Sequence, residues 1–175
     1  MVDRVESPGT SCAVHVAAPV SRVWELVTDI ALPARLSPEL YRVAWLDGAD
    51  RAAPYARFEG FNRNDVLGEW RTVSYVVELV EPRVFAWAVT DADGRYGAPT
   101  SDPARPMATW RYELAPEDGG TRLHQSVVLG PARSGVDLAI DRWPDRAEQI
   151  VATRLADLRA AMATTLDGIA ALARH

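Results

Sequence analysis

The apolar positions of the chain change their spacing twice. Near the N-terminus, a short strand at residues 12–17 precedes apolar residues at helical spacing, which predict a helix opening at Ala18-Pro19. A second short helix is predicted after Asp29. It should end near Ser37-Pro38, because the residue before a proline avoids the helical region. Helical spacing returns from about Val136, so two helical regions bracket the middle of the sequence.

Between these regions, six segments are rich in Val, Trp, Tyr, Phe and Thr and are separated by residues that favour turns. Consecutive strands with short connections predict an antiparallel meander. The stretch 94–106 contains three prolines and is predicted to be a surface loop. The predicted strands are residues 41–47, 55–63, 69–80, 83–91, 107–115 and 121–130.

The last helical region is long enough to lie across a whole sheet. From Trp143 to Leu172 it would measure about 45 Å at 1.5 Å per residue. Pro144 is predicted to kink this helix or to mark its true beginning. Its apolar stripe consists of Val151, Leu155, Leu158, Met162, Leu166 and Ile169.

Charged residues sort the two faces of the predicted sheet, because successive side chains of a strand point to opposite sides. Arg and Glu side chains share one parity in the strands, which we assign to solvent and which also holds His124. The opposite parity contains no carboxylate and no histidine before Glu78, which lies at a strand end, unless a β-bulge reverses the phase. The predicted inward set is Phe58, Gly60, Asn62, Trp70, Thr72, Ser74, Val76, Phe85, Trp87, Val89, Trp110, Tyr112, Leu114, Leu123, Gln125 and Val127.

This inward set has two interpretations. Its tryptophans can simply fill a core, as buried aromatic residues usually do. Alternatively, sheet and helix close incompletely and leave a pocket, since ligand pockets are mostly apolar with a few placed polar groups. The candidate ligand-binding residues are Phe58, Asn62, Trp70, Thr72, Ser74, Phe85, Trp87, Trp110, Tyr112 and Gln125 from the strands, with Leu158 and Met162 from the facing helix.

Composition supports one domain spanning residues 1–175, with residues 1–11 expected to be flexible. The chain has 175 residues, 48% of them hydrophobic, which is enough for a sizeable core. A net charge of -5 disfavours a nucleic-acid partner. The single cysteine, Cys12, excludes an intrachain disulfide. With neither a signal-peptide pattern nor an apolar membrane span, we expect a cytoplasmic protein without stable membrane insertion.

Little in the sequence indicates acid–base, metal or cofactor chemistry. There are three histidines, of which His124 shares the charged parity, and there is no lysine for a Schiff base. Asp137, Asp141 and Asp145 are spaced four apart, but an acidic row is usually a solvated helix face, so no metal site is predicted. No cofactor is expected. This chemistry favours binding over catalysis.

Four segments carry a family resemblance: VHVAAPVSRVWELVTDI (14–30), ARFEGFNRN (56–64), VVELVEPRVFAWAV (76–89) and GTRLHQSVVLG (120–130). Their order resembles the START/Bet v 1-like (SRPBCC) superfamily, and within it the bacterial polyketide cyclase/dehydrase-type branch. The resemblance implies an α+β helix-grip fold, in which a curved antiparallel sheet wraps around a long C-terminal helix with two short helices after the first strand. It also implies a hydrophobic cavity between sheet and helix.

Three hypotheses for the function remain open, because the superfamily includes carriers and enzymes. The first is binding of a small hydrophobic or polycyclic molecule. The second is a polyketide aromatase/cyclase, for which Asn62 and Tyr112 are the best candidate catalytic residues, since such a role needs polar groups that orient a poly-β-keto chain. The third is a protein-interaction module with a vestigial pocket. The sequence leaves the oligomeric state and the identity of a ligand open.

Overall fold

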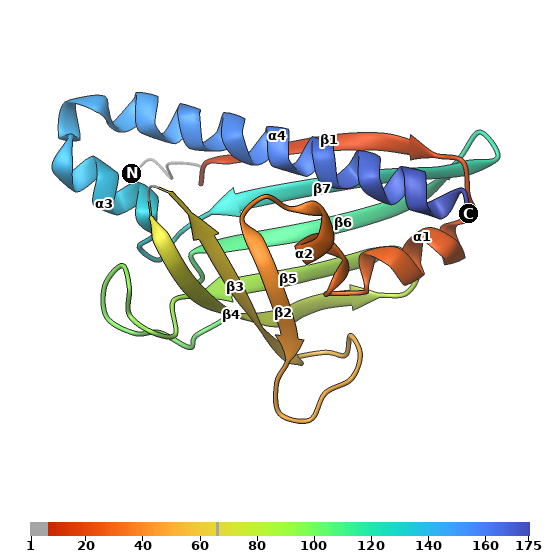
Figure 1. Cartoon of the computed structure of the whole chain (residues 1–175), viewed down its shortest axis with the longest axis horizontal. Helices are drawn as coiled ribbons and strands as arrows, with labels where there is room; N and C mark the ends of the chain where they lie inside the picture. The colour runs from red at the N-terminus through yellow and green to blue at the C-terminus, as the bar shows by residue number, and fades with distance from the viewer. Residues whose placement is uncertain (1–6, 66) are drawn as a thin grey trace, which may run out of the picture.

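A computed structural model describes residues 7–65 and 67–175. Its seven-stranded antiparallel sheet has the order β1-β7-β6-β5-β4-β3-β2 and curves around the long helix α4 (Figure 1). The elements are β1 (Gly9–Val16), α1 (Val20–Val27), α2 (Leu32–Leu36), β2 (Leu40–Trp45), β3 (Arg57–Asn64), β4 (Gly68–Val80), β5 (Val84–Thr90), β6 (Ala108–Glu117), β7 (Gly120–Leu129), α3 (Gly135–Arg142), the 3₁₀ turn η1 (Pro144–Arg146) and α4 (Ala147–Ala173).

The helix-grip α+β fold predicted from the sequence is therefore confirmed. Two short helices follow the first strand, a meander of hairpins forms most of the sheet, and the last long helix packs along β1 and against α1 and α2 (Figure 1). The predicted loop at 94–106 lies between β5 and β6, as expected.

The start of the chain differs in part from the prediction. Residues 1–6 lie outside the described residues, but residues 9–11, which were also expected to be flexible, belong to β1. Gly9 lies opposite Val128 and Ser11 opposite Ser126 in the antiparallel ladder. Strand β7 would otherwise be an open edge, and pairing with β1 satisfies its backbone hydrogen-bonding groups.

The C-terminal region is two helices. Ser134 begins α3 with a capping box, in which its side chain accepts from the Val136 backbone N–H and the Asp137 carboxylate accepts from the Ser134 backbone N–H. Pro144 then opens the 3₁₀ turn that leads into α4 at Ala147. Pro144 thus marks the boundary before the long helix, one of the two roles predicted for it.

The charged face predicted from strand parity lies on the outside of the sheet. Arg71 pairs with Glu59 and Asp93 there, and Arg111 pairs with Glu78 and Glu113. The inward assignment of Glu78 is wrong. A bulge between Val76 and Glu78 shifts the register, so that Val76 lies opposite Trp87 but Glu78 lies opposite Ala86, and the carboxylate turns outward.

Burial along α4 changes abruptly near its middle. None of its residues before Leu158 is buried, although Val151 and Leu155 are partly covered. Leu158 and Met162 pack with Val127, and from Leu166 onward the helix packs into the main closed core with α1 and the ends of β6 and β7. The first half of α4 therefore faces the sheet without filling the space between them.

Candidate ligand cavity

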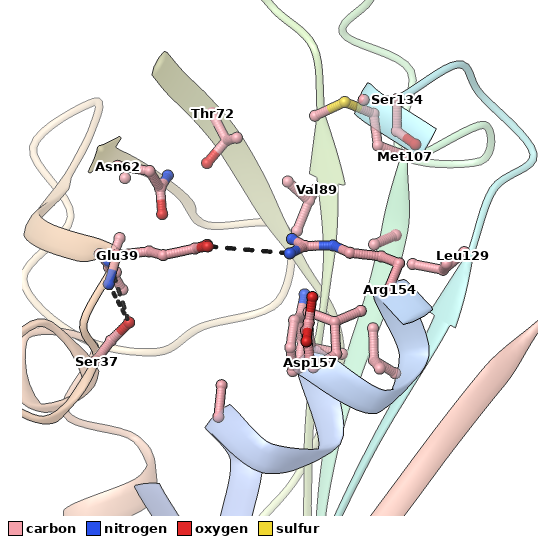
Figure 2. A pocket seen from close by; sticks show the side chains of 18 of the residues that line it. Ser37, Glu39, Asn62, Thr72, Val89, Met107, Leu129, Ser134, Arg154 and Asp157 are labelled. Atoms are coloured by element: carbon pink, nitrogen blue, oxygen red, sulfur yellow. Dashed lines mark hydrogen bonds and ion pairs between the residues drawn. The ribbon is translucent and has the colours of Figure 1, made fainter. Parts of the chain in front are cut away.

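A cavity of about 1040 Å³ lies between the inner face of the sheet and the helices α3 and α4. Its wall includes all twelve residues that the sequence predicted to bind a ligand, which come from β3 to β7 and from α4. Parity along the strands brings them together, since each strand contributes alternate side chains to one face. Figure 2 shows part of this wall, with Asn62, Thr72 and Val89 on the strands opposite Arg154 and Asp157 of α4.

A continuous group of aromatic rings forms the sheet side of the cavity. Trp87 and Trp110 lie opposite each other on β5 and β6 and stack with ring centroids 6.3 Å apart and an interplanar angle of 8°. Phe85 and Tyr112 each contact Trp87, with centroids 5.2 and 5.6 Å from it. Both tryptophans remain partly exposed although they point inward. They therefore line a cavity and do not complete a packed core.

The cavity ends where the closed core begins. On β6 the inward residues Ala108, Trp110 and Tyr112 line the cavity, whereas the next inward residue, Leu114, does not and is packed in the core. Strand β7 shows the same change between Gln125, which lines the cavity, and Leu123, which does not. Tyr112 and Gln125 lie directly opposite each other at this inner end.

The two candidate catalytic residues are not close together. Asn62 lies on β3, opposite Trp70, and Tyr112 lies on β6, so strands β4 and β5 separate them. Burial raises the pKa of the Tyr112 hydroxyl well above its usual range, and the hydroxyl is therefore a protonated hydrogen-bond donor at neutral pH. Nothing in this arrangement makes the two side chains act on the same atom.

Polar residues that the sequence analysis did not nominate lie near Asn62 and Thr72. Glu39 follows α2, and its carboxylate reaches Arg154 of α4 across the cavity at 4.0 Å (Figure 2). Asn64 donates to the same carboxylate at 3.3 Å. The Ser37 hydroxyl accepts from the backbone N–H groups of Glu39 and Leu40 at 3.2 and 3.1 Å and so positions the start of β2.

The cavity residues of α4 were missed because of the face of the helix on which they lie. Arg154 and Asp157 do not belong to the apolar stripe of α4 that the sequence predicts to face the core. In the first half of α4, the face that lines the cavity lies next to this stripe and is more polar. Its members recur every three or four positions, a signal that could have indicated a second inward face. They are Gln149, Ile150, Thr153, Arg154, Asp157, Leu158 and Ala161.

Helix α3 and the loop before β6 contribute further wall residues. Val136 and Ala139 come from α3, Trp143 is its C-terminal cap, and Tyr96 and Met107 come from the loop region. Tyr96 is buried although its segment is a surface loop. Its backbone N–H donates to Asp91, and its carbonyl accepts from Arg133, which also pairs with Asp141.

The remaining titratable candidates lie elsewhere. His124 lies on the outer face beside Glu113 and Arg122, away from the cavity, as the charged parity predicted. Of the acidic row, Asp137 caps α3 and Asp141 pairs with Arg133. In residues 7–65 and 67–175, no three His, Cys, Asp or Glu side chains cluster as metal ligands. Among the same residues, no helix is both long enough and apolar enough to span a membrane.

The sequence was compared with protein families and with curated proteins, and it matches one family. Residues 9–171 match a family model described as polyketide cyclase / dehydrase and lipid transport. No curated protein matches the chain significantly.

Similar solved structures extend over most of the chain. The polyketide-cyclase-like protein Cgl2372 from Corynebacterium glutamicum is 25% identical, with a TM-score of 0.63 and coverage of 94% of this chain and 90% of that one. Protein Ms6760 from Mycobacterium smegmatis is 19% identical, with a TM-score of 0.60 and coverage of 95% and 92%. The Zhui aromatase/cyclase from Streptomyces sp. R1128 is 17% identical, with a TM-score of 0.66 and coverage of 95% and 93%. These likenesses support the fold and leave the function to be argued from the site.

Proposed function

Because the chain belongs to the polyketide cyclase / dehydrase and lipid transport family, we propose that it binds a small hydrophobic or polycyclic molecule in the cavity between the sheet and α4. The observation that carries this proposal is the stacked pair Trp87 and Trp110, which point inward but are incompletely covered by protein. Large apolar rings left accessible in a concave site lose water when a ligand enters, and this stabilises the complex.

The cavity favours a flat, mostly apolar ligand of several rings. Its volume of about 1040 Å³ lies at the upper end of the range of pockets that enclose drug-sized molecules. Rings offer large contact surfaces to the aromatic wall at low conformational cost. Met162, a deformable side chain on the facing helix, lets the opposite wall adapt to the ligand's outline.

A titration with a naphthalene sulfonate tests the proposal through probe fluorescence and quenching of the tryptophans. We expect saturable binding by the wild-type protein. Ser74→Phe, which places a ring in the cavity, should weaken that binding at least about tenfold, equal to 1.4 kcal/mol. Ser126→Phe is the matched control, because Ser126 lies on β7 outside the cavity wall and opposite Arg111 of the charged face.

Two results would refute binding in this cavity. One is the absence of saturable probe binding by the wild type, and the other is an equal loss in Ser74→Phe and Ser126→Phe. Native mass spectrometry of freshly purified protein adds an independent measurement, since a ligand retained during purification appears as a discrete added mass.

An aromatase/cyclase function is the second candidate. It is supported by the polar groups distributed along an otherwise apolar cavity, from Asn62 and the Glu39–Arg154 pair to Tyr112 at the inner end. Such groups can orient a chain that carries carbonyls at regular intervals. The test is incubation with a poly-β-ketone: a changed pattern of cyclised products, lost in Tyr112→Phe, supports an enzyme, and an unchanged pattern supports a binding protein.

The third hypothesis, an interaction module with a vestigial pocket, has less support, since the cavity is neither filled nor small. A cytoplasmic location and the lack of a nucleic-acid partner stay predictions from the sequence.

A further inference from the structure

The end of the cavity next to the closed core carries two polar side chains in apolar surroundings. Tyr112 and Gln125 are 1% and 4% exposed and face each other across β6 and β7. Beyond them lie the leucines Leu114 and Leu123 of the core, and on the other side lie Trp110 and Val127 of the cavity wall. A leucine or phenylalanine at either position would match these surroundings, so the two polar groups are not explained by packing.

The buried oxygen of Gln125 is not satisfied by the residues that the structure describes. Among the described residues, the buried Oε1 atom of Gln125 has no hydrogen-bond partner. The Tyr112 side chain, 1% exposed, lines the cavity from the position on β6 directly opposite Gln125. Nearly all buried polar groups in folded proteins have a partner, because each one left unpaired destabilises the fold. A ligand that enters the cavity can supply the missing partner of Gln125 and contact Tyr112 opposite it.

We propose that Tyr112 and Gln125 form a subsite that takes a hydroxyl group, such as a phenol, on the leading end of a polycyclic ligand. This inference rests on the proposed function, ligand binding in the cavity, and specifies the class of ligand. A hydroxyl accepts from the Tyr112 hydroxyl and donates to Oε1 of Gln125, so one group satisfies both residues. A carbonyl or ether oxygen could accept from the tyrosine but could not donate to the glutamine oxygen.

The electrostatic state of the pair fits this assignment. A tyrosine hydroxyl is protonated at neutral pH and burial raises its pKa further, so Tyr112 is available as a donor. The Glu39–Arg154 ion pair lies near Asn62 and Thr72 (Figure 2), whereas at Tyr112 burial is the largest cause of the raised pKa.

The test compares 2-naphthol with 2-methylnaphthalene, a pair of probes matched in size. The measured quantity is the ratio of their dissociation constants, each obtained by displacement of a fluorescent naphthalene sulfonate. Comparing this ratio between variants cancels the difference in hydrophobicity between the two probes. We expect Tyr112→Phe and Gln125→Leu each to shift the ratio about tenfold against 2-naphthol, which corresponds to 1.4 kcal/mol. Binding of 2-methylnaphthalene should stay within about twofold of wild type.

Two measurements separate the subsite from folding and from the cavity itself. Melting temperatures show whether a variant is folded, and Ser126→Ala is the control, since its hydroxyl lies outside the cavity wall. A ratio unchanged in both Tyr112→Phe and Gln125→Leu, with 2-methylnaphthalene still bound, overturns the subsite and leaves the proposed function standing. Failure of the wild type to bind either naphthalene overturns both.

Discussion

The boundary between the cavity and the closed core can be tested on α4 without any ligand. Leu158 and Leu166 are about two turns apart, and both are buried. Only Leu158 lines the cavity, whereas Leu166 packs in the closed core with Leu114 and Leu123. We therefore expect the same substitution, leucine to alanine, to destabilise the protein by different amounts at the two positions.

The expected difference follows from what surrounds each side chain. Removing the buried carbons of a leucine costs about 2 kcal/mol, at about 0.8 kcal/mol per CH₂ group. At Leu166 the removed atoms leave a new closed void, which adds about 24 cal/mol per Å³ and brings the total to about 3 to 5 kcal/mol. At Leu158 the removed atoms only enlarge an existing cavity, so the cost should stay near about 2 kcal/mol.

Urea unfolding of the two variants and the wild type measures these free energies. The slopes of the transitions must agree for the comparison to hold. Leu172→Ala is the matched control on the same helix, because its side chain is 40% exposed and should cost little. Equal costs at Leu158 and Leu166, or a larger cost at Leu158, would show that the helix packs tightly along its whole length and that the cavity does not extend to Leu158.

Three further predictions concern other parts of the molecule. A chain ending at Arg146 lacks α4 and exposes the apolar surface it covers, so it should lose the cooperative melting transition seen by circular dichroism; a soluble, cooperatively melting product would contradict this. His124→Ala should leave the melting temperature and probe affinity unchanged, because the imidazole lies on the outer face; a tenfold loss of affinity would refute that placement. Hydrogen bonding to Arg71 lowers the pKa of Asp93, so this pair stabilises the fold at neutral pH and its contribution is lost as pH falls below about 4. In Asp93→Asn, the free energy of unfolding should therefore fall less steeply than in the wild type as the pH is lowered below about 4. An unchanged pH dependence would show that the pair does not contribute to stability.

The order of elements could be predicted from the sequence because it depends on local patterns. The change from helical to alternating spacing and back placed the strands, the two short helices and the long last helix. The bulge in β4 could not be predicted, because an extra residue leaves no mark in composition. As a result, the predicted orientation of Glu78 was wrong, since its side chain pairs with Arg111 on the outer face.

Residues of the cavity wall on the strands could also be predicted, and those on helices largely could not. A side chain of a strand points to one of only two faces. Once the charged residues are assigned to the outer face, the alternate residues are therefore assigned to the inner face. A helix offers a continuous range of directions, and the most apolar stripe need not face the cavity. On α4 the stripe through Val151 and Leu155 differs from the face that carries Arg154 and Asp157 into the cavity wall.

The depth of the cavity is the property that sequence patterns do not contain. Trp110, Tyr112 and Leu114 follow one another on the inner face of β6, and alternation treats all three alike. Only the first two line the cavity, because beyond them α4 packs onto the sheet in the closed core, where Leu166 belongs to the same cluster as Leu114. That position depends on the curvature of the assembled sheet and on the turn through α3 and Pro144 that sets where α4 begins (Figure 1). In the sequence, Tyr112 and Gln125 are only two polar residues in an apolar pattern. The structure suggests a function for them, because it places both at the boundary between the cavity and the closed core.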